Sequence, residues 1–186
     1  MTTCIQFSSF SFISQNARGL KSNVKIKELC IQIKSQNILA ACIQETWLNG
    51  QFIVEHDGYT FIHHGIEPNA DQSKRGKEGV AIVLSRDALN AWNATGRAVL
   101  SEFGSRILAV RLICKDLRGK DVGMFLISTY APVGTAKDSL WKSFLTNLQN
   151  CIRSKPKDDI SLIGCNCNSS LGIGYGRRPG GTTIYR

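Results

Sequence analysis

The sequence has no apolar run long enough to cross a bilayer, because the longest, residues 38–43, falls far short of the ~20 residues that a membrane-spanning helix needs. No basic segment precedes an apolar stretch after Met1, so we expect no secretory signal, no membrane partner and an intracellular location. No linker or low-complexity segment divides the 186 residues, which predicts one domain. We place this domain at residues 9–171, after a lead-in of residues 1–8. We expect the Gly/Arg-rich tail, residues 172–186, to be poorly ordered.

Carboxylate and imidazole side chains are absent from the last part of the sequence. Its last carboxylate is Asp159, and residues 160–186 contain no Asp, Glu or His. The seven cysteines are an odd number scattered through apolar segments, which is typical of reduced, buried thiols rather than of a disulfide framework. Cys165 and Cys167 form a Cys-x-Cys pair, but no second pair of cysteines or histidines stands near it to complete a zinc site. We therefore expect only two thiols at the end of a strand there.

Basic residues outnumber acidic ones, with 23 Lys and Arg against 14 Asp and Glu, a formal net charge of +9. This excess favours a polyanionic partner, because protein cations that neutralise phosphates release condensed counterions. Charge by itself identifies neither a fold nor a partner, since many basic loops are merely solvated. The candidate phosphate contacts lie in a basic loop and in the tail: Lys74, Arg75, Lys77, Arg177 and Arg178.

The apolar pattern alternates between strand and helix periods. Residues 9–15 switch between polar and apolar as a half-buried strand does, and Ser22 or Asn23 can cap the helix that follows. The apolar stripe of that helix comprises Val24, Ile26, Leu29, Cys30 and Ile33. Residues 38–43 have the continuous apolar pattern of a strand buried on both faces. The first 45 residues thus predict a strand–helix–strand unit of an α/β fold.

The second half of the chain repeats this order after a stretch that is rich in strands. Further strands are predicted at residues 59–63, 79–84, 107–113, 122–130 and 160–164. Residues 135–153 return to a helical period. The apolar side of this helix comprises Leu140, Phe144, Leu145, Leu148 and Ile152. A helix again leads into a short buried strand.

Polar residues stand where several of these strands end. They are Asn16, Glu45, Tyr130, Asn166 and Asn168. In layered α/β folds ligands bind where strand ends converge, so we expect one rim of the molecule to gather all five. A carboxylate surrounded by carboxamides and a phenol is a candidate site for a hard cation and a phosphate. Polar residues also follow strands simply because the chain leaves the core, so the position alone is a weak signal.

Five segments occur in the order of a known superfamily. They are FISQNARGL at residues 12–20, IQETWL at residues 43–48, GVAIV at residues 79–83, SRI at residues 105–107 and STYAP at residues 128–132. This series resembles the endonuclease/exonuclease/phosphatase superfamily and looks closest to the apurinic-type endonuclease domain of non-LTR retrotransposons. The resemblance implies a four-layered α/β/β/α sandwich of two mixed sheets, and a chain that is incomplete at its C-terminus. It also implies Mg²⁺-dependent hydrolysis of DNA phosphodiesters, with Mn²⁺ as a substitute metal.

The resemblance assigns roles to individual residues. Glu45 would be a magnesium ligand, and Asn16 would help to hold the metal and the attacking water. Tyr130 would donate its hydroxyl to the scissile phosphate, whereas Arg106 would brace the sheet. Residues 165–168 align with the family's Gly-Asp-Phe-Asn element, and Asn168 matches the Asn of that element. The implied partner is DNA, encountered in the nucleus if the substrate is chromosomal, and the domain would precede a reverse transcriptase in a longer polyprotein.

Two departures from the family change this expectation. Asn166 occupies the place of the family's Asp, and a carboxamide has no useful basicity. The family's downstream Ser-Asp and Asp-His elements have no counterpart here, and His63 and His64 are expected to pack in a loop or at the surface rather than replace them. We therefore expect inactive or severely impaired chemistry and weakened magnesium binding. We also expect an exposed apolar face or an open sheet edge.

Two alternatives remain beside an impaired nuclease. The chain could be a non-catalytic basic module that binds DNA through its phosphates. It could also be a phosphoesterase of the same superfamily that acts on a phosphoinositide or a small phosphoester. The sequences QETW at residues 44–47 and YAPV at residues 130–133 favour the nuclease branch of the superfamily.

Overall fold

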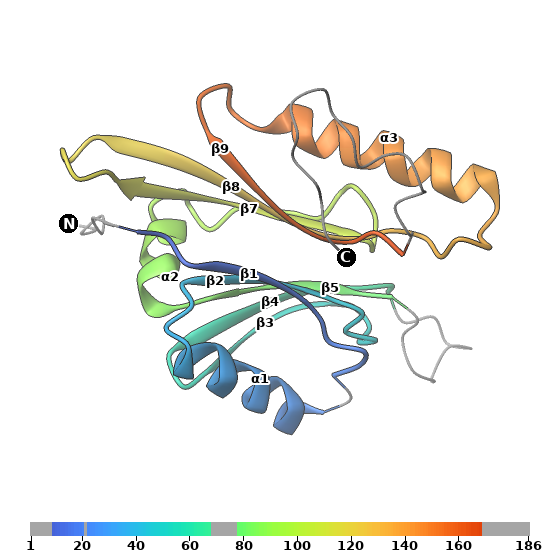
Figure 1. Ribbon diagram of the computed structural model, residues 1–186, viewed down its shortest axis with the longest axis horizontal. Coiled ribbons are helices and arrows are strands. Elements are labelled where there is room, and N and C mark those ends of the chain that lie inside the picture. The colour runs from blue at the N-terminus through green and yellow to red at the C-terminus, as the bar shows by residue number, and fades with distance from the viewer. Residues whose placement is uncertain (1–8, 21, 68–77, 169–186) are drawn as a thin grey trace, which may run out of the picture.

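Two sheets pack face to face, with a helix on the outer face of each, in the computed structural model (Figure 1), which describes residues 9–20, 22–67 and 78–168. The first sheet contains β1 Phe12–Asn16, β2 Ala40–Gln44, β3 Gln51–His56, β4 Tyr59–His64 and β5 Val80–Leu84, and the second contains β6 Val99–Leu100, β7 Ile107–Lys115, β8 Asp121–Tyr130 and β9 Ile160–Asn166. The helices are α1 Asn23–Ser35, α2 Arg86–Asn93 and α3 Asp138–Ser154. The predicted four-layered α/β/β/α architecture is confirmed.

Each sheet is mixed and holds one parallel pair of strands. The five-stranded sheet has the order β1-β2-β5-β4-β3, and the four-stranded sheet has the order β6-β7-β8-β9. Only β1 with β2 and β8 with β9 run parallel among these described strands. The helix α1 connects the first parallel pair and α3 connects the second. Since parallel strands end on the same side of a sheet, each pair carries its terminal residues to one edge.

Three apolar cores separate the four layers. The first lies between α1 and the five-stranded sheet, where Ile26 and Ile33 pack on residues such as Ile43 and Phe61. The second lies between the two sheets and includes the buried Trp92. The helix α2, which carries Trp92, lies at one end of the space between the sheets (Figure 1). The third lies between the four-stranded sheet and α3, whose Phe144 and Cys151 are buried. The strands between two cores are therefore apolar on both faces, as the continuous pattern of β2 predicts.

Local signals explain where two of the helices begin. The side chain of Ser22 accepts a hydrogen bond from the backbone of Lys25 and caps α1, one of the two predicted caps. Ser85 caps α2 in the same way through the backbone of Ala88. The prediction for Val24 was wrong, because its side chain is 64% exposed. It stands in the first turn of α1, ahead of the part of the helix that faces the sheet.

The outer surface near α3 and β9 carries exposed apolar side chains. The predicted apolar side of α3 is only partly covered, since Leu140, Leu145 and Ile152 are exposed. On β9, Ile160 is 51% and Ile163 is 42% exposed, and β9 is an edge strand among the described strands. The expected exposed apolar face and open sheet edge are thus both present as far as the described residues extend. No helix in the described ranges is long and apolar enough to traverse a bilayer.

Candidate functional site

The ends of the two parallel strand pairs meet and bring five polar side chains together. Asn16 ends β1 and Glu45 directly follows β2, both from the five-stranded sheet. Tyr130 ends β8, Asn166 ends β9 and Asn168 lies two residues further on, all from the four-stranded sheet. The site is therefore assembled across the two sheets, at the rim expected from the strand ends.

Glu45 lies at the centre of this cluster and accepts two amide hydrogen bonds at the same oxygen. The Nδ2 atom of Asn16 donates to its Oε1 at 2.7 Å, and the Nδ2 atom of Asn166 donates to the same Oε1 at 2.9 Å. The amide oxygens face the backbone instead, because Asn16 Oδ1 accepts from the Arg18 amide and Asn166 Oδ1 accepts from the Asn168 amide. Hydrogen bonds to an ionised carboxylate are the strong ones, so both carboxamides hold Glu45 in place.

Tyr130 places a buried phenol beside the carboxylate. Burial raises the pKa of its hydroxyl, a hydrogen bond to Asn168 opposes that rise, and the negative charge of Glu45 adds to it. The hydroxyl is therefore protonated near neutral pH and can donate a hydrogen bond. The amide of Asn168 also donates to the carbonyl of Ala131 at 2.8 Å, which fixes the segment after β9 against the end of β8.

Arg106 supports this tyrosine from the side. Its guanidinium lies 5.0 Å from the centre of the Tyr130 ring and donates to the carbonyls of Tyr130 and Ala131 at 3.3 Å. It also pairs with Glu78 at 2.5 Å, and the Ser105 hydroxyl donates to the same carboxylate. Both partners of the ion pair are less than one fifth exposed. This geometry is a brace for the strand end, the role expected for Arg106.

The two sheets are also joined by polar contacts just below the site. Gln44 Nε2 donates across the interface to the Ser128 hydroxyl at 3.3 Å and to the Gly164 carbonyl at 3.2 Å. The Ser128 hydroxyl donates back to the Ile43 carbonyl at 3.1 Å. A Cβ atom at Gly164 would overlap the side chain of Cys42, so a larger residue there would force the sheets apart. These contacts set the relative position of the strand ends that carry the site.

The backbone around Glu45 is held in unfavourable conformations. Positive φ angles occur at Arg18 (48°), Glu45 (54°), Trp47 (55°) and Asn168 (45°), four of the seven such non-glycine residues in the described part of the chain. Three backbone hydrogen bonds, from residues 17, 19 and 20 to the carbonyls of residues 44, 45 and 46, tie the loop after β1 to the segment after β2. Strain of this kind concentrates at functional sites, where surrounding contacts maintain it.

His63 has a different place from the one expected. It lies on β4 with a fully buried side chain, where Nε2 is 2.8 Å from Thr46 Oγ1 and Nδ1 is 3.0 Å from the Gly50 carbonyl. Burial lowers its pKa to about 4, so the ring is neutral near pH 7. The surface or loop packing predicted for it was wrong, because the strand continues through His63 and the ring stacks on Phe52. Its contact with Thr46 supports the segment that follows Glu45.

The side chains that could hold a metal ion are few. No group of three His, Cys, Asp or Glu side chains with suitable geometry occurs among the described residues. Mg²⁺ binds through one or two carboxylates and keeps several waters, so Glu45 with the Asn16 amide oxygen is the smallest set that fits. One oxygen of Glu45 is already occupied by two amide donors. The Asn16 amide oxygen accepts from the Arg18 backbone amide and its amide nitrogen faces Glu45, so the two side chains would have to rearrange before they could hold a magnesium ion together.

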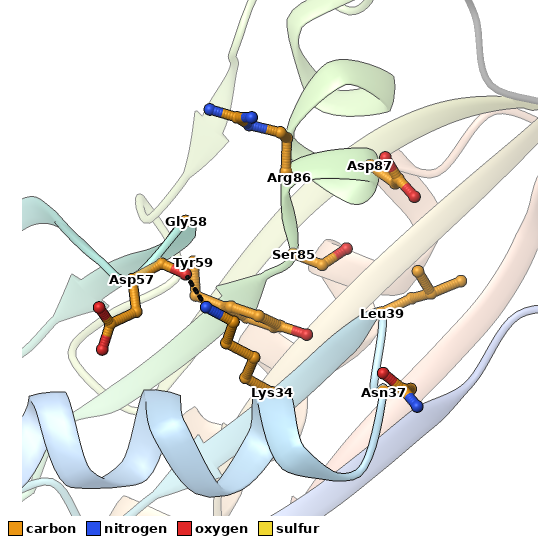
Figure 2. Close-up of a pocket in the computed structure, with 9 residues that line it drawn as sticks. All are labelled: Lys34, Asn37, Leu39, Asp57, Gly58, Tyr59, Ser85, Arg86 and Asp87. Atoms are coloured by element: carbon orange, nitrogen blue, oxygen red, sulfur yellow. Dashed lines mark hydrogen bonds between the residues drawn. The ribbon is translucent and has the colours of Figure 1, made fainter.

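Other surfaces contribute less to the interpretation of this site. The predicted phosphate contacts Lys74, Arg75, Lys77, Arg177 and Arg178 lie outside the described residues. The cavity in Figure 2, about 610 Å³, is lined by residues that include Leu39, just before β2, and Ser85, just after β5. Because β5 runs antiparallel to β2, this cavity lies at the opposite end of the sheet from Glu45. It contains none of the predicted site residues.

Comparison with known proteins places the fold but supplies no sequence family. No protein-family description matches the chain, and no curated protein matches it either. Among solved structures, the crystal structure of the Xenopus laevis APE2 catalytic domain is similar, with a TM-score of 0.55 and 15% sequence identity. The match covers 86% of this chain and 58% of that catalytic domain. At this level of identity the similarity concerns the fold alone.

Proposed function

We propose that this chain is an endonuclease-like domain of retrotransposon origin, by lineage a Mg²⁺-dependent DNA phosphodiester hydrolase, whose hydrolytic activity is lost or severely impaired. The observation that carries this proposal is the pair of amides on Glu45, in which Asn166 donates a hydrogen bond to the carboxylate. The retrotransposon origin rests on the resemblance of the five sequence segments. On this proposal, the domain would bind DNA beside a reverse transcriptase of the same polyprotein.

The residues at the rim have distinct roles in this proposal. Glu45 would hold the magnesium ion with help from Asn16, and the ion would offset the charge that develops on the phosphoryl oxygens. The protonated hydroxyl of Tyr130 would donate a hydrogen bond to a phosphate oxygen. Asn168 would hold that hydroxyl in position from the other side. On this proposal, these four residues would bind and orient the phosphodiester.

Proton transfer from water is the step that this set of residues does not provide. Asn166 stands where the family's Asp would take the proton, and an amide cannot accept it. General-base assistance is typically worth about 10²–10⁴ in rate, so its loss removes most turnover. His63 does not substitute, because it is fully buried and both of its ring nitrogens have partners. The amide at position 166 therefore supports the proposed impairment of hydrolysis.

A plasmid-nicking assay tests this proposal. Supercoiled plasmid is incubated with the protein and Mg²⁺, and separately with Mn²⁺, beside a Glu45→Gln control that removes the expected metal ligand. We expect no nicking above the control with either metal. We also expect Asn166→Asp to restore little activity, since no imidazole is available at the site. Robust metal-dependent nicking that Glu45→Gln abolishes would refute the claim of impairment.

The net charge favours a second candidate function, a non-catalytic module that binds DNA. A formal charge of +9 supports binding to phosphates without any chemistry. The test is the affinity for a short duplex over a series of salt concentrations, with Lys74, Arg75 and Lys77 changed to Ala together. A steep fall with salt that becomes shallower in the triple variant supports this function. No measurable affinity at low salt excludes it.

A further inference from the structure

Two thiols flank Asn166, one of the two residues that donate a hydrogen bond to Glu45. Cys165 lies in β9 and Cys167 directly follows the strand, so both neighbour Asn166 in sequence. Their sulfur atoms are 3.0 Å apart, and Cys167 is exposed to solvent while Cys165 is partly exposed. The other cysteines of the described ranges, Cys30, Cys42, Cys114 and Cys151, are all buried. These two thiols are therefore the solvent-accessible ones in the described part of the protein.

The separation of the two sulfurs distinguishes between two uses of such a pair. Two thiolates on one tetrahedral zinc ion lie roughly 3.8 Å apart, given Zn–S bonds of about 2.3 Å. A disulfide bond is about 2.05 Å long. At 3.0 Å the sulfurs are closer together than a shared zinc ion permits. No third metal-binding side chain joins them in the described residues, so the geometry favours oxidation over metal binding.

We infer that Cys165 and Cys167 are a reversible oxidation site, which closes into an intrachain disulfide beside Asn166. The oxidant is a small disulfide such as glutathione disulfide. The exposed Cys167 thiolate attacks it, forms a mixed disulfide and releases one glutathione thiolate, which takes up the proton that Cys167 lost. Cys165 then loses its proton, attacks the mixed disulfide at Cys167 and releases the second glutathione. One glutathione disulfide is reduced to two glutathiones, and two protein thiols are oxidised.

Formation of the disulfide would affect the site by changing the backbone conformation of Asn166. Closing the sulfurs from 3.0 Å to bonding distance draws the two flanking residues together and bends the strand end between them. The carbonyl of Asn166 accepts from the Ala131 amide at 2.9 Å, and its side chain donates to Glu45. Both bonds depend on the extended conformation of β9. A small ring through one intervening residue is strained, and strained disulfides are the labile, regulatory ones.

The test uses the full chain with Cys4→Ser, which removes the cysteine outside the described residues. The protein is equilibrated in glutathione buffers from fully reduced to fully oxidised, and its intact mass is measured after acid quenching. We expect the protein mass to fall by two hydrogen atoms, with no glutathione attached to the protein, and dithiothreitol to reverse this change. In Cys165→Ser we expect one retained glutathione, because the resolving thiol is missing, and in Cys167→Ser no change. The mass of the fully reduced protein, with all six remaining thiols free, in the most oxidising buffer would overturn the inference, as would glutathione retained on the protein that still has Cys165.

A second readout tests the connection to the site and does not depend on the proposed nuclease function. Hydrogen exchange is measured at the amides of Ala131 and Asn168 in the reduced and oxidised protein. We expect several-fold faster exchange in the oxidised form and no change in Cys167→Ser under the same buffers. Equal exchange in the two forms would show that the disulfide does not move Asn166, and would overturn that part of the inference.

Discussion

The Asn166→Asp substitution tests the arrangement around Glu45 most directly. It replaces an amide donor, 2.9 Å from Glu45 Oε1, with a second carboxylate. A hydrogen bond to a charged group contributes about 1.5–3 kcal/mol, and this contribution is lost. Two unit charges about 3 Å apart repel by roughly 5 kcal/mol at an effective dielectric constant of 20, and solvent at this partly exposed site screens most of that repulsion. We expect a net destabilisation of about 3 kcal/mol in the absence of divalent metal.

Magnesium should reverse this loss in the variant. At a concentration of about 100 times its Kd, a ligand that binds only the folded state stabilises by about 2.7 kcal/mol. For a chain of this size 1 kcal/mol corresponds to roughly 2–4 °C in Tm, so Asn166→Asp should melt about 6–12 °C lower in EDTA. Saturating Mg²⁺ should recover most of that difference. The parent protein, with one carboxylate at the site, should respond only slightly.

A matched control separates charge from the lost hydrogen bond. Asn166→Ala removes the same donor and adds no charge, so it should be destabilised less than Asn166→Asp and should not respond to Mg²⁺. The assay is thermal unfolding followed by circular dichroism, with and without the metal. Equal melting temperatures for the two variants in EDTA, with no response to magnesium in either, would refute the placement of Asn166 beside Glu45.

Three further predictions concern stability and the exposed surface. Gly79→Ala should lower the free energy of unfolding, measured in urea, by at least about 2 kcal/mol. Gly79 has a φ of 105°, and a Cβ there would clash with Thr46 and lie 3.0 Å from His63 Nε2. Gly58→Ala is the control: Gly58 has a φ of 81° but open space around it, so the substitution should cost about 1 kcal/mol. The folded-state pKa of His63, about 4, is below its unfolded value of about 6.5, so its stabilising effect is present above pH 6.5 and lost as pH falls toward 4. His63→Phe should flatten the fall in Tm over that range, and an unchanged slope would contradict the buried neutral ring. The exposed apolar side chains of α3 and β9 should bind a hydrophobic dye in the native state, whereas a sharp melt without dye binding would count against an open apolar surface.

The sequence was most informative where strands are buried on both faces. The continuous apolar pattern near residues 38–43 predicted β2, and the alternating one near residues 9–15 predicted β1, with bounds that shifted by one to three residues. β3 escaped prediction because Ile53 lies on its outer side, 44% exposed, and obscures the alternation of polar and apolar residues. α2 escaped because it is short and its buried side includes two alanines. Tertiary contacts, rather than local patterns, decide both elements.

The candidate site shows the same division. Its position followed from strand ends, because parallel neighbours end on one side of a sheet whatever their side chains are. Its internal geometry did not follow. That Asn16 and Asn166 share one oxygen of Glu45 depends on the register of β1 with β2 and of β8 with β9. The burial of His63 depends on how β3 and the segment after Glu45 cover it, which no local pattern encodes.

The two-sheet origin of the site has a mechanical consequence. Asn16 and Glu45 come from one sheet, and Tyr130 and Asn166 come from the other. A molecule that binds the site residues of both sheets at once would oppose any sliding of one sheet over the other, because sliding would cost part of its binding energy. By the same coupling, a substitution in the distant core that lets the layers slip weakens binding while helices and strands stay intact. A state with native secondary structure but without fixed packing between the sheets would therefore not bind such a molecule. Its binding affinity would then be a more sensitive measure of interlayer packing than circular dichroism.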